Sequence, residues 1–256
     1  SFGMKSQVYP EYAPLLLAAK QLGRPVKWTD ERSESFLSDH HGRDHQRVAE
    51  LALDRDGHFL AVRLTGYGNA GAYIYPPMPA TTNAVKNVID VYRTPAMEVN
   101  SKVVFTNTTP VAAYRGAGRP EGNYYMERLI DTAAREMGID RVEMRRINAI
   151  PREAFPYKTP TGSVYDSGDP KGLIDDVVKH ADWAGFEKRR QESLSRGKLR
   201  GISCCAFIEP AGGGGSPVEE VAIKFGESGN PILYTVSGPS GQGHETTYPE
   251  IRSEEH

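Results

Sequence analysis

The spacing of apolar residues predicts a long helix in the middle of the chain. Apolar side chains recur at helical intervals from Met126 to Met137, and Gly138 follows as a stop signal. Pro120 suits the first turn of this helix, where its missing N–H costs nothing. A further helix is expected over residues 12–22, and its largely apolar face indicates burial. Other helices are expected from Asp140 to Ile147, after Asp169-Pro170, over residues 186–196, and from Glu245 onward.

Alternating apolar and polar residues predict strands between these helices. Residues 49–53 and 60–64 alternate on either side of Asp56-Gly57, which indicates a β-hairpin with one buried face. Strands are also expected over residues 26–29, 102–106 and 201–208, and a second hairpin over 218–225 and 232–237. We therefore predict an α+β fold of two lobes, each of mixed sheets with packed helices, with residues 1–160 in the first lobe and 161–256 in the second.

Composition and charge restrict the classes of partner. The formal net charge of -2 gives no reason to expect nucleic acid or an anionic membrane surface. No run of about 18 or more apolar residues occurs, so no membrane-spanning helix is expected. The adjacent Cys204 and Cys205 are typical of small buried hydrophobic residues, and so few cysteines favour a reduced, cytoplasmic location.

Three histidines, His40, His41 and His45, lie in a polar stretch that could hold a metal ion or form a solvated loop. No carboxylate or cysteine is placed to complete a ligand set with them. We therefore favour the solvated loop, and we predict no metal-ligating side chains.

A glycine-rich elbow precedes the long helix and carries the candidate chemistry. Gly116 and Gly118 allow close approach of a ligand, and the helix start with Arg115 and Arg119 offers N–H groups and positive charge to an anion. The alternative is a tight turn with two solvated arginines. A second glycine loop contains Gln242, which can both donate and accept hydrogen bonds. The residues alone thus predict an anionic small ligand or an organic cofactor.

The elbow also resembles a known motif. Residues 111–121, Val-Ala-Ala-Tyr-Arg-Gly-Ala-Gly-Arg-Pro-Glu, are similar to the pterin-contacting loop of the xanthine dehydrogenase / aldehyde oxidase / aerobic carbon monoxide dehydrogenase family, in its large molybdenum-binding subunit. Residues 1–5 resemble the end of that family's Gly-Gly-x-Phe-Gly-x-Lys loop, and residues 238–247 resemble its Gly-Gln-Gly-x-x-Thr loop. Residues 143–148 resemble its Arg-Arg-x-Asn helix end. The likeness covers essentially the whole chain, with the loops in the family's order.

The resemblance implies the fold of the molybdopterin-binding domains and an oxidoreductase that hydroxylates its substrate with water-derived oxygen. It implies a molybdopterin cofactor, which in bacteria often carries a cytosine dinucleotide, and partner subunits with iron–sulfur clusters and FAD, assembled as a dimer of heterotrimers. The metal is held by pterin sulfurs, so no protein ligands are required. The cofactor-binding residues implied by the match are Phe2 and Gly3 beside the metal's apical oxygen, Arg115, Gly116 and Ala117 at the pterin, and Gly241, Gln242, Gly243 and His244 at the pyrophosphate side.

Departures from the family pattern narrow the expected substrate. Gly116 stands where copper-containing carbon monoxide dehydrogenases have a cysteine. Ala117 and Ser6 stand where xanthine dehydrogenases have a substrate-stacking Phe and a purine-reading Glu. We therefore expect an aldehyde or an N-heterocycle as substrate, rather than carbon monoxide or a purine.

The family's catalytic Glu has no counterpart here, because Glu250, Glu254 and Glu255 lack its glycine-flanked setting. We expect that Glu beyond His256, which makes the chain a fragment without activity of its own. The alternative reading is a non-catalytic anion-binding module, or a scaffold subunit of the same fold.

Overall fold

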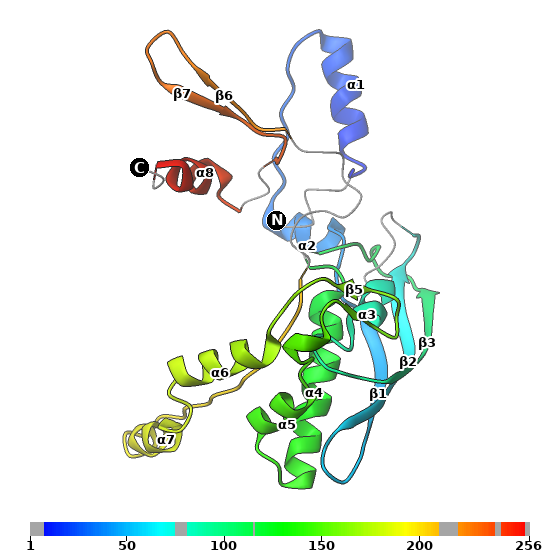
Figure 1. Ribbon diagram of the computed structural model, residues 1–256. Helices are drawn as coiled ribbons and strands as arrows, with labels where there is room; N and C mark the ends of the chain where they lie inside the picture. Colours follow the sequence, from blue (N-terminus) through cyan, green and yellow to red (C-terminus); the bar gives the residue numbers. More distant parts are fainter. Residues whose placement is uncertain (1–7, 75–80, 115, 210–219, 239–241, 254–256) are drawn as a thin grey trace. The chain divides into compact units, whose positions relative to one another are not determined.

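The structure, a computed structural model, describes residues 8–74, 81–114, 116–209, 220–238 and 242–253 (Figure 1). The chain divides into two compact units: a central unit, His40–Glu209, and a flanking unit made of Ser1–Asp39 and Pro210–His256. The predicted lobe boundary at residue 160 falls inside the central unit, so the division into residues 1–160 and 161–256 stays a prediction. Within the described ranges, no helix has the length and apolar character needed to cross a bilayer.

A three-stranded sheet forms one layer of the central unit. Its strands are β1 (His45–Leu53), β2 (Phe59–Gly71) and β3 (Ala96–Phe105), in the order β1-β2-β3. The predicted hairpin is confirmed as the antiparallel β1–β2 pair. Asp54 closes its turn by accepting hydrogen bonds from the N–H groups of Asp56 and His58, both at 2.9 Å. The strand predicted at 102–106 is the end of β3, which pairs in parallel with β2.

Helices pack against one face of this sheet (Figure 1). The predicted long helix is α4 (Arg119–Met137), which ends at Gly138 in the left-handed conformation. The α5 helix (Arg141–Asn148) begins where Asp140 accepts hydrogen bonds from two main-chain N–H groups. The core between sheet and helices is built from the fully buried side chains Val62, Leu64, Val88, Met126 and Ile130, with α3 (Thr81–Asn87) completing the layer.

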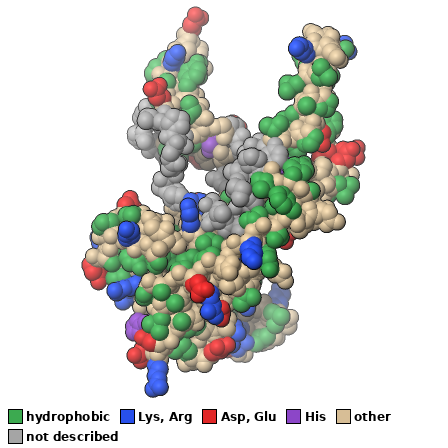
Figure 2. All heavy atoms as spheres, turned by 90° about the vertical axis from the view of Figure 1, so that its right-hand side faces the viewer, with side chains coloured by type: hydrophobic (Ala, Val, Ile, Leu, Met, Phe, Trp, Pro, Cys, Tyr) green, Lys and Arg blue, Asp and Glu red, His purple; other side chains and the backbone are tan. Residues whose placement is uncertain are grey.

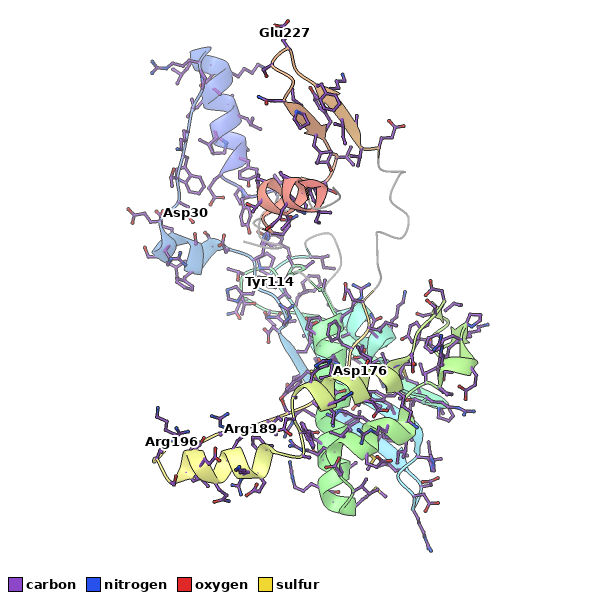
Figure 3. All side chains as sticks on the ribbon, turned by 60° about the vertical axis from the view of Figure 1, so that its left-hand side comes forward. Asp30, Tyr114, Asp176, Arg189, Arg196 and Glu227 are labelled. Atoms are coloured by element: carbon purple, nitrogen blue, oxygen red, sulfur yellow. The ribbon has the colours of Figure 1, made fainter. Side chains whose placement is uncertain are left out.

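Smaller elements complete the central unit. The 3-10 turn η2 (Arg152–Ala154) precedes a short hairpin of β4 (Tyr157–Lys158) and β5 (Val164–Tyr165). The predicted helix after Asp169 is α6 (Pro170–His180), and α7 (Phe186–Leu194), the predicted charged helix, follows it. Arg189 and Arg196, labelled in Figure 3, mark the α7 region, and both helices extend away from the sheet.

A buried ionic cluster joins the helices to the rest of the core. Arg145 is 1% exposed and donates from Nε to Glu127 Oε2 at 2.9 Å and from Nη2 to Asp131 Oδ1 at 2.9 Å. The Tyr92 hydroxyl donates to Glu127 Oε1 at 2.5 Å. A charge buried in this way is tolerable only because each member has partners. Asn148 extends the polar core, since it accepts from the Phe59 N–H at 2.8 Å.

Residues 201–208, predicted to be a strand, are extended but pair with no strand among the described residues. Side chains of the central unit bond the main chain of this segment in place of a neighbouring strand. Glu127 Oε1 accepts from the Ala206 N–H at 3.2 Å, and Asn123 Nδ2 donates to the Ala206 carbonyl at 2.6 Å. Asp90 Oδ1 accepts from the Ile208 N–H at 2.6 Å, and burial raises the pKa of Asp90 to about 7.

The cysteines lie in this extended segment. Cys204 is partly buried and packs against the cluster of Val142, Ala149 and Ile174, as predicted for a small hydrophobic residue. Cys205 is exposed, so the same prediction is wrong for it, because successive side chains of an extended segment point to opposite sides.

The flanking unit contains α1 (Tyr12–Leu22), α2 (Arg32–Ser38), the hairpin of β6 (Ala222–Phe225) and β7 (Pro231–Tyr234), and α8 (His244–Ser253). The predicted bounds of α1 are confirmed, but none of its residues is buried, so the expectation of a buried helix is wrong in this structure. The strand predicted at 26–29 does not form, and α2 lies in a stretch for which no helix was predicted. The Gly-rich stretch 212–215 lies outside the described residues.

The ionic cluster yields a prediction about stability. Replacing Glu127 with Ala leaves the buried Arg145 guanidinium with an incomplete set of acceptors, so we expect the free energy of unfolding to fall by about 3–5 kcal/mol. The matched control is Glu50→Ala, which removes an exposed partner of Arg63 and should change little. Urea denaturation of both variants measures the difference, and equal losses would contradict the role given to the cluster.

Candidate functional site

The elbow before α4 is a tight turn that satisfies its own main chain. Gly116 and Gly118 have φ angles of 93° and 101°, which favour glycine. The Ala117 N–H donates to the Tyr114 carbonyl at 2.8 Å, and the Arg119 N–H donates to the Gly116 carbonyl at 3.0 Å. The Gly122 N–H donates to the Gly118 carbonyl at 2.9 Å. These donors are therefore used within the turn.

Glu121 occupies the place predicted for an anion. Its side chain is buried, and Oε2 accepts from the Gly118 N–H at 2.9 Å, as in a capping box. The positive end of the α4 dipole thus already faces a carboxylate of the chain. The main-chain donors described for this helix start are bonded within the turn or to Glu121, and the anion site stays a prediction. Arg119 forms an ion pair with Glu209 at 3.3 Å, and Arg115 lies outside the described residues.

Arg43 reaches the elbow from a neighbouring segment. The main chain around His41 runs beside that around Val111 in a parallel bridge, with the Ala112 N–H donating to the His41 carbonyl at 2.9 Å. Arg43 Nε lies 3.4 Å from Glu121 Oε1, and its guanidinium carbon lies 4.9 Å from the ring centroid of Tyr114, which is labelled in Figure 3. This is a cation–π geometry beside an ion pair.

Asn69 holds the segment that leads into the elbow. Its Nδ2 donates to Asp44 Oδ2 at 2.7 Å and to Thr108 Oγ1 at 2.9 Å. Its Oδ1 accepts from the Gly71 N–H at 2.7 Å and from Thr106 Oγ1 at 2.8 Å. One buried amide therefore ties the end of β2, the start of β1 and the approach to the elbow together.

The predicted solvated loop is wrong for His40, which is buried, and for His45, which is partly buried, whereas the His41 side chain is exposed. His41 takes part in the bridge to Val111, and His45 Nδ1 lies 2.8 Å from the Tyr125 hydroxyl. Burial, followed by the charge of Arg47, lowers the pKa of His45. His41 therefore supports the approach to the elbow through its main chain, and His45 contacts the α4 helix. Within the described ranges, the group that could hold a metal ion is Asp54, Asp56 and His58 in the hairpin turn, which includes none of the three.

The second candidate loop lies in the flanking unit, at the start of α8. The N–H groups of Thr246 and Thr247 both donate to the Gly243 carbonyl at 3.0 Å, so the helix begins directly after Gly243. Gln242 Nε2 donates to the Gly238 carbonyl at 3.3 Å. The first N–H groups of any helix lack helical acceptors, so the main chain here can serve a ligand.

His244 is fixed on both ring nitrogens. Nδ1 lies 3.2 Å from the Ser237 carbonyl oxygen, and Nε2 lies 3.3 Å from the Tyr248 hydroxyl, with the two rings stacked at 4.4 Å between centroids. We therefore expect a contact of this residue with a ligand to use its main chain.

The described site residues fall into two groups. Gly116 and Ala117 belong to the central unit, and Gln242, Gly243 and His244 belong to the flanking unit. Phe2, Gly3, Arg115 and Gly241 lie outside the described residues. Sequence reasoning missed Glu121 as a cap, although a Glu three residues after Gly118 is the pattern of a capping box. It also missed Arg43 and Asn69, for which the local sequence carries no signal.

The elbow suits a ring system better than a phosphate. Gly116 and Ala117 are only partly buried and present main chain and one methyl group on a turn whose donors bond internally. A Cβ on Gly116 would lie 2.9 Å from Pro120 Cγ, so this turn has no room for a larger residue on that side. The contact of Gly116 and Ala117 with a pterin stays a prediction.

The approach to the elbow yields a second prediction. Gly71 and Gly138 both adopt left-handed φ angles, 77° and 68°, but an added Cβ would lie 2.3 Å from the Thr109 carbonyl oxygen at Gly71 and in open space at Gly138. Gly138→Ala should lower the free energy of unfolding by about 1–2 kcal/mol from backbone strain alone. Gly71→Ala adds a clash with main-chain atoms and should cost about 1–3 kcal/mol more. Urea denaturation of the pair tests this, and equal costs would show that the approach segment is not held closely.

The chain is similar to a known domain family and to subunits of known dehydrogenases. The family model described as "Molybdopterin cofactor-binding domain" matches residues 1–149, a stretch that ends just after α5. The chain is 32% identical to the 6-hydroxypseudooxynicotine dehydrogenase complex subunit gamma of Paenarthrobacter nicotinovorans, covering 100% of this chain and 33% of that protein. It is also 32% identical to the carbon monoxide dehydrogenase large chain of Hydrogenophaga pseudoflava, covering 98% and 33%.

Solved structures agree with these matches. Quinoline 2-oxidoreductase from Pseudomonas putida 86 superposes with a TM-score of 0.85 at 33% identity, covering 99% of this chain and 34% of that one. The Cu,Mo-CO dehydrogenase superposes with a TM-score of 0.80 at 30% identity, covering 98% and 34%. The predicted α+β fold of the molybdopterin-binding subunits is confirmed, and the chain spans about a third of the length of the relatives it matches. Because the family model matches more than half of the chain, the protein belongs to the molybdopterin cofactor-binding domain family.

Proposed function

We propose that the chain is part of the large, molybdopterin-binding subunit of a molybdenum hydroxylase. The observation that carries this proposal is the similarity of 98–99% of the chain to a nicotine 6-hydroxylase large subunit, a carbon monoxide dehydrogenase large chain and a xanthine dehydrogenase molybdenum-binding subunit. When bound, the molybdenum centre supplies the redox chemistry by which water-derived oxygen enters a substrate. The chain's own residues would hold the cofactor and shape its surroundings.

Gly116 and Ala117 would border the pterin through main-chain atoms and the Ala117 methyl group, on the turn stabilised by Glu121. Gln242, Gly243 and His244 would bind the pyrophosphate side through the main chain at the start of α8. Phe2, Gly3, Arg115 and Gly241 keep the roles that the sequence resemblance implies for them. Residues 1–160 would belong to the first molybdopterin-binding lobe and residues 161–256 to the second, a division supported by the family match over 1–149.

An N-heterocycle is the substrate class we propose. Several similar proteins act, by their names, on ring systems of this kind, among them nicotine 6-hydroxylase of Paenarthrobacter nicotinovorans and quinoline 2-oxidoreductase. Gly116 and Ala117 keep the elbow free of a bulky or thiol side chain, which supports a flat substrate rather than carbon monoxide.

Partner subunits carrying iron–sulfur clusters and FAD are part of the proposal. The names of the relatives, "complex subunit gamma" and "large chain", describe subunits of larger assemblies. Leu60, Tyr67 and Phe105 expose between about half and two-thirds of their surface on the central unit, and hydrophobic side chains lie among charged ones on the face drawn in Figure 2. Such side chains are available to pack against further parts of a large subunit or its partners.

Metal and phosphorus analysis of the native protein, isolated with its partner subunits, tests the proposal. We expect about one molybdenum per chain together with pterin phosphate, because the cofactor is bound tightly and co-purifies. A host that loads its other molybdenum enzymes provides the control. Absence of both elements from the protein of that host would favour the scaffold reading over the enzyme.

A further inference from the structure

We propose that Arg43 and Glu121 are positioning residues that hold the elbow in its cofactor-binding conformation. This inference rests on the proposed function, since it assigns the role of two residues behind the pterin edge. It depends on contacts within the central unit alone.

Arg43 touches the elbow at separate points. Its Nε lies 3.4 Å from Glu121 Oε1, and its guanidinium lies over the Tyr114 ring. Its Nη2 lies 3.8 Å from where a Cβ of Gly116 would be, which places the guanidinium close to the partly buried turn. One planar cation thus contacts Tyr114 before the turn and Glu121 in the helix after it, and it lies beside the turn itself.

Arg43 adopts a backbone conformation that non-glycine residues avoid. Its φ angle is 62°, in the left-handed region. Strained residues of this kind persist where the surroundings determine them, and they gather at functional sites. The bridge between His41 and Val111 helps to hold Arg43 in this conformation, because it fixes the main chain two residues before Arg43. A Cβ on Gly42 would lie 3.0 Å from Tyr114 Cβ, so the two segments also approach closely there.

Glu121 connects this cation to the start of α4. One carboxylate oxygen caps the Gly118 N–H and the other pairs with Arg43, at a residue that is 6% exposed. Losing either partner frees the turn from the helix behind it. The elbow would then sample other conformations, and the edge offered to the pterin would no longer be preformed.

The test compares loss of molybdenum with loss of stability in the native holoenzyme. The variants are Arg43→Ala, Arg43→Lys and Glu121→Gln. Asp131→Ala is the matched control on the same helix, because it removes an acceptor of the buried Arg145 far from the elbow. Arg63→Ala is the control for loss of an arginine from an exposed ion pair.

Molybdenum retention is followed by elemental analysis during dialysis, and stability by urea denaturation. We expect Arg43→Ala to lose molybdenum on the order of tenfold faster than the unmodified protein, as for other partners lying behind a bound group. Arg43→Lys should lose molybdenum more slowly than Arg43→Ala. Glu121→Gln should lose it at a rate between those of Arg43→Ala and the unmodified protein, because an amide oxygen can still accept from the Gly118 N–H. Asp131→Ala should unfold at lower urea yet retain molybdenum nearly as well as Arg63→Ala.

Two results would overturn the inference. One is retention that follows stability, with Asp131→Ala losing molybdenum as fast as Arg43→Ala. The other is equal retention in every variant of a protein that carries molybdenum. Absence of molybdenum from the unmodified protein is a different outcome, since it rejects the proposed function itself and the positioning role with it.

Discussion

The carboxylate of Glu127 is the point on which the central unit depends. It accepts from the Tyr92 hydroxyl, the buried Arg145 guanidinium and the Ala206 N–H. These partners are remote from one another in sequence, so the cluster joins the loop before β3, the α4 and α5 helices and the extended segment that leaves the unit. Because a buried charge without its partners is strongly destabilising, removing one member of the cluster destabilises the others as well. It fixes the α4 helix, and the elbow sits at the start of that helix.

In the proposed function, the elbow is a site for an organic cofactor that is built without a charged cradle. Its main-chain donors bond within the turn, and Glu121 takes the place of an external anion at the helix start. Asn69 holds the segment that leads into the turn, and Arg43 contacts Tyr114 before the turn and Glu121 after it. What remains on the surface is a rigid edge of small residues. A preformed edge of this kind loses less conformational entropy on binding than a loose loop would.

Local patterns predicted local structure well. The β1–β2 hairpin, the start and end of α4 and the capping of α5 by Asp140 follow from residues close in sequence. Features that depend on distant partners were missed or misread. These include the parallel pairing of β3, the hydrogen bonds that hold residues 201–208, and the buried surroundings of His40. The family and its site came from motif resemblance, whereas the support of the elbow required the structure.

In the proposed function, the cofactor lies against the elbow. Anomalous diffraction at the molybdenum absorption edge, from crystals of the native protein with its partner subunits, tests this directly. We predict one molybdenum peak per chain, with pterin density along the main chain of Gly116 and Ala117. A molybdenum peak remote from these residues, with the elbow covered by protein side chains, would contradict the account.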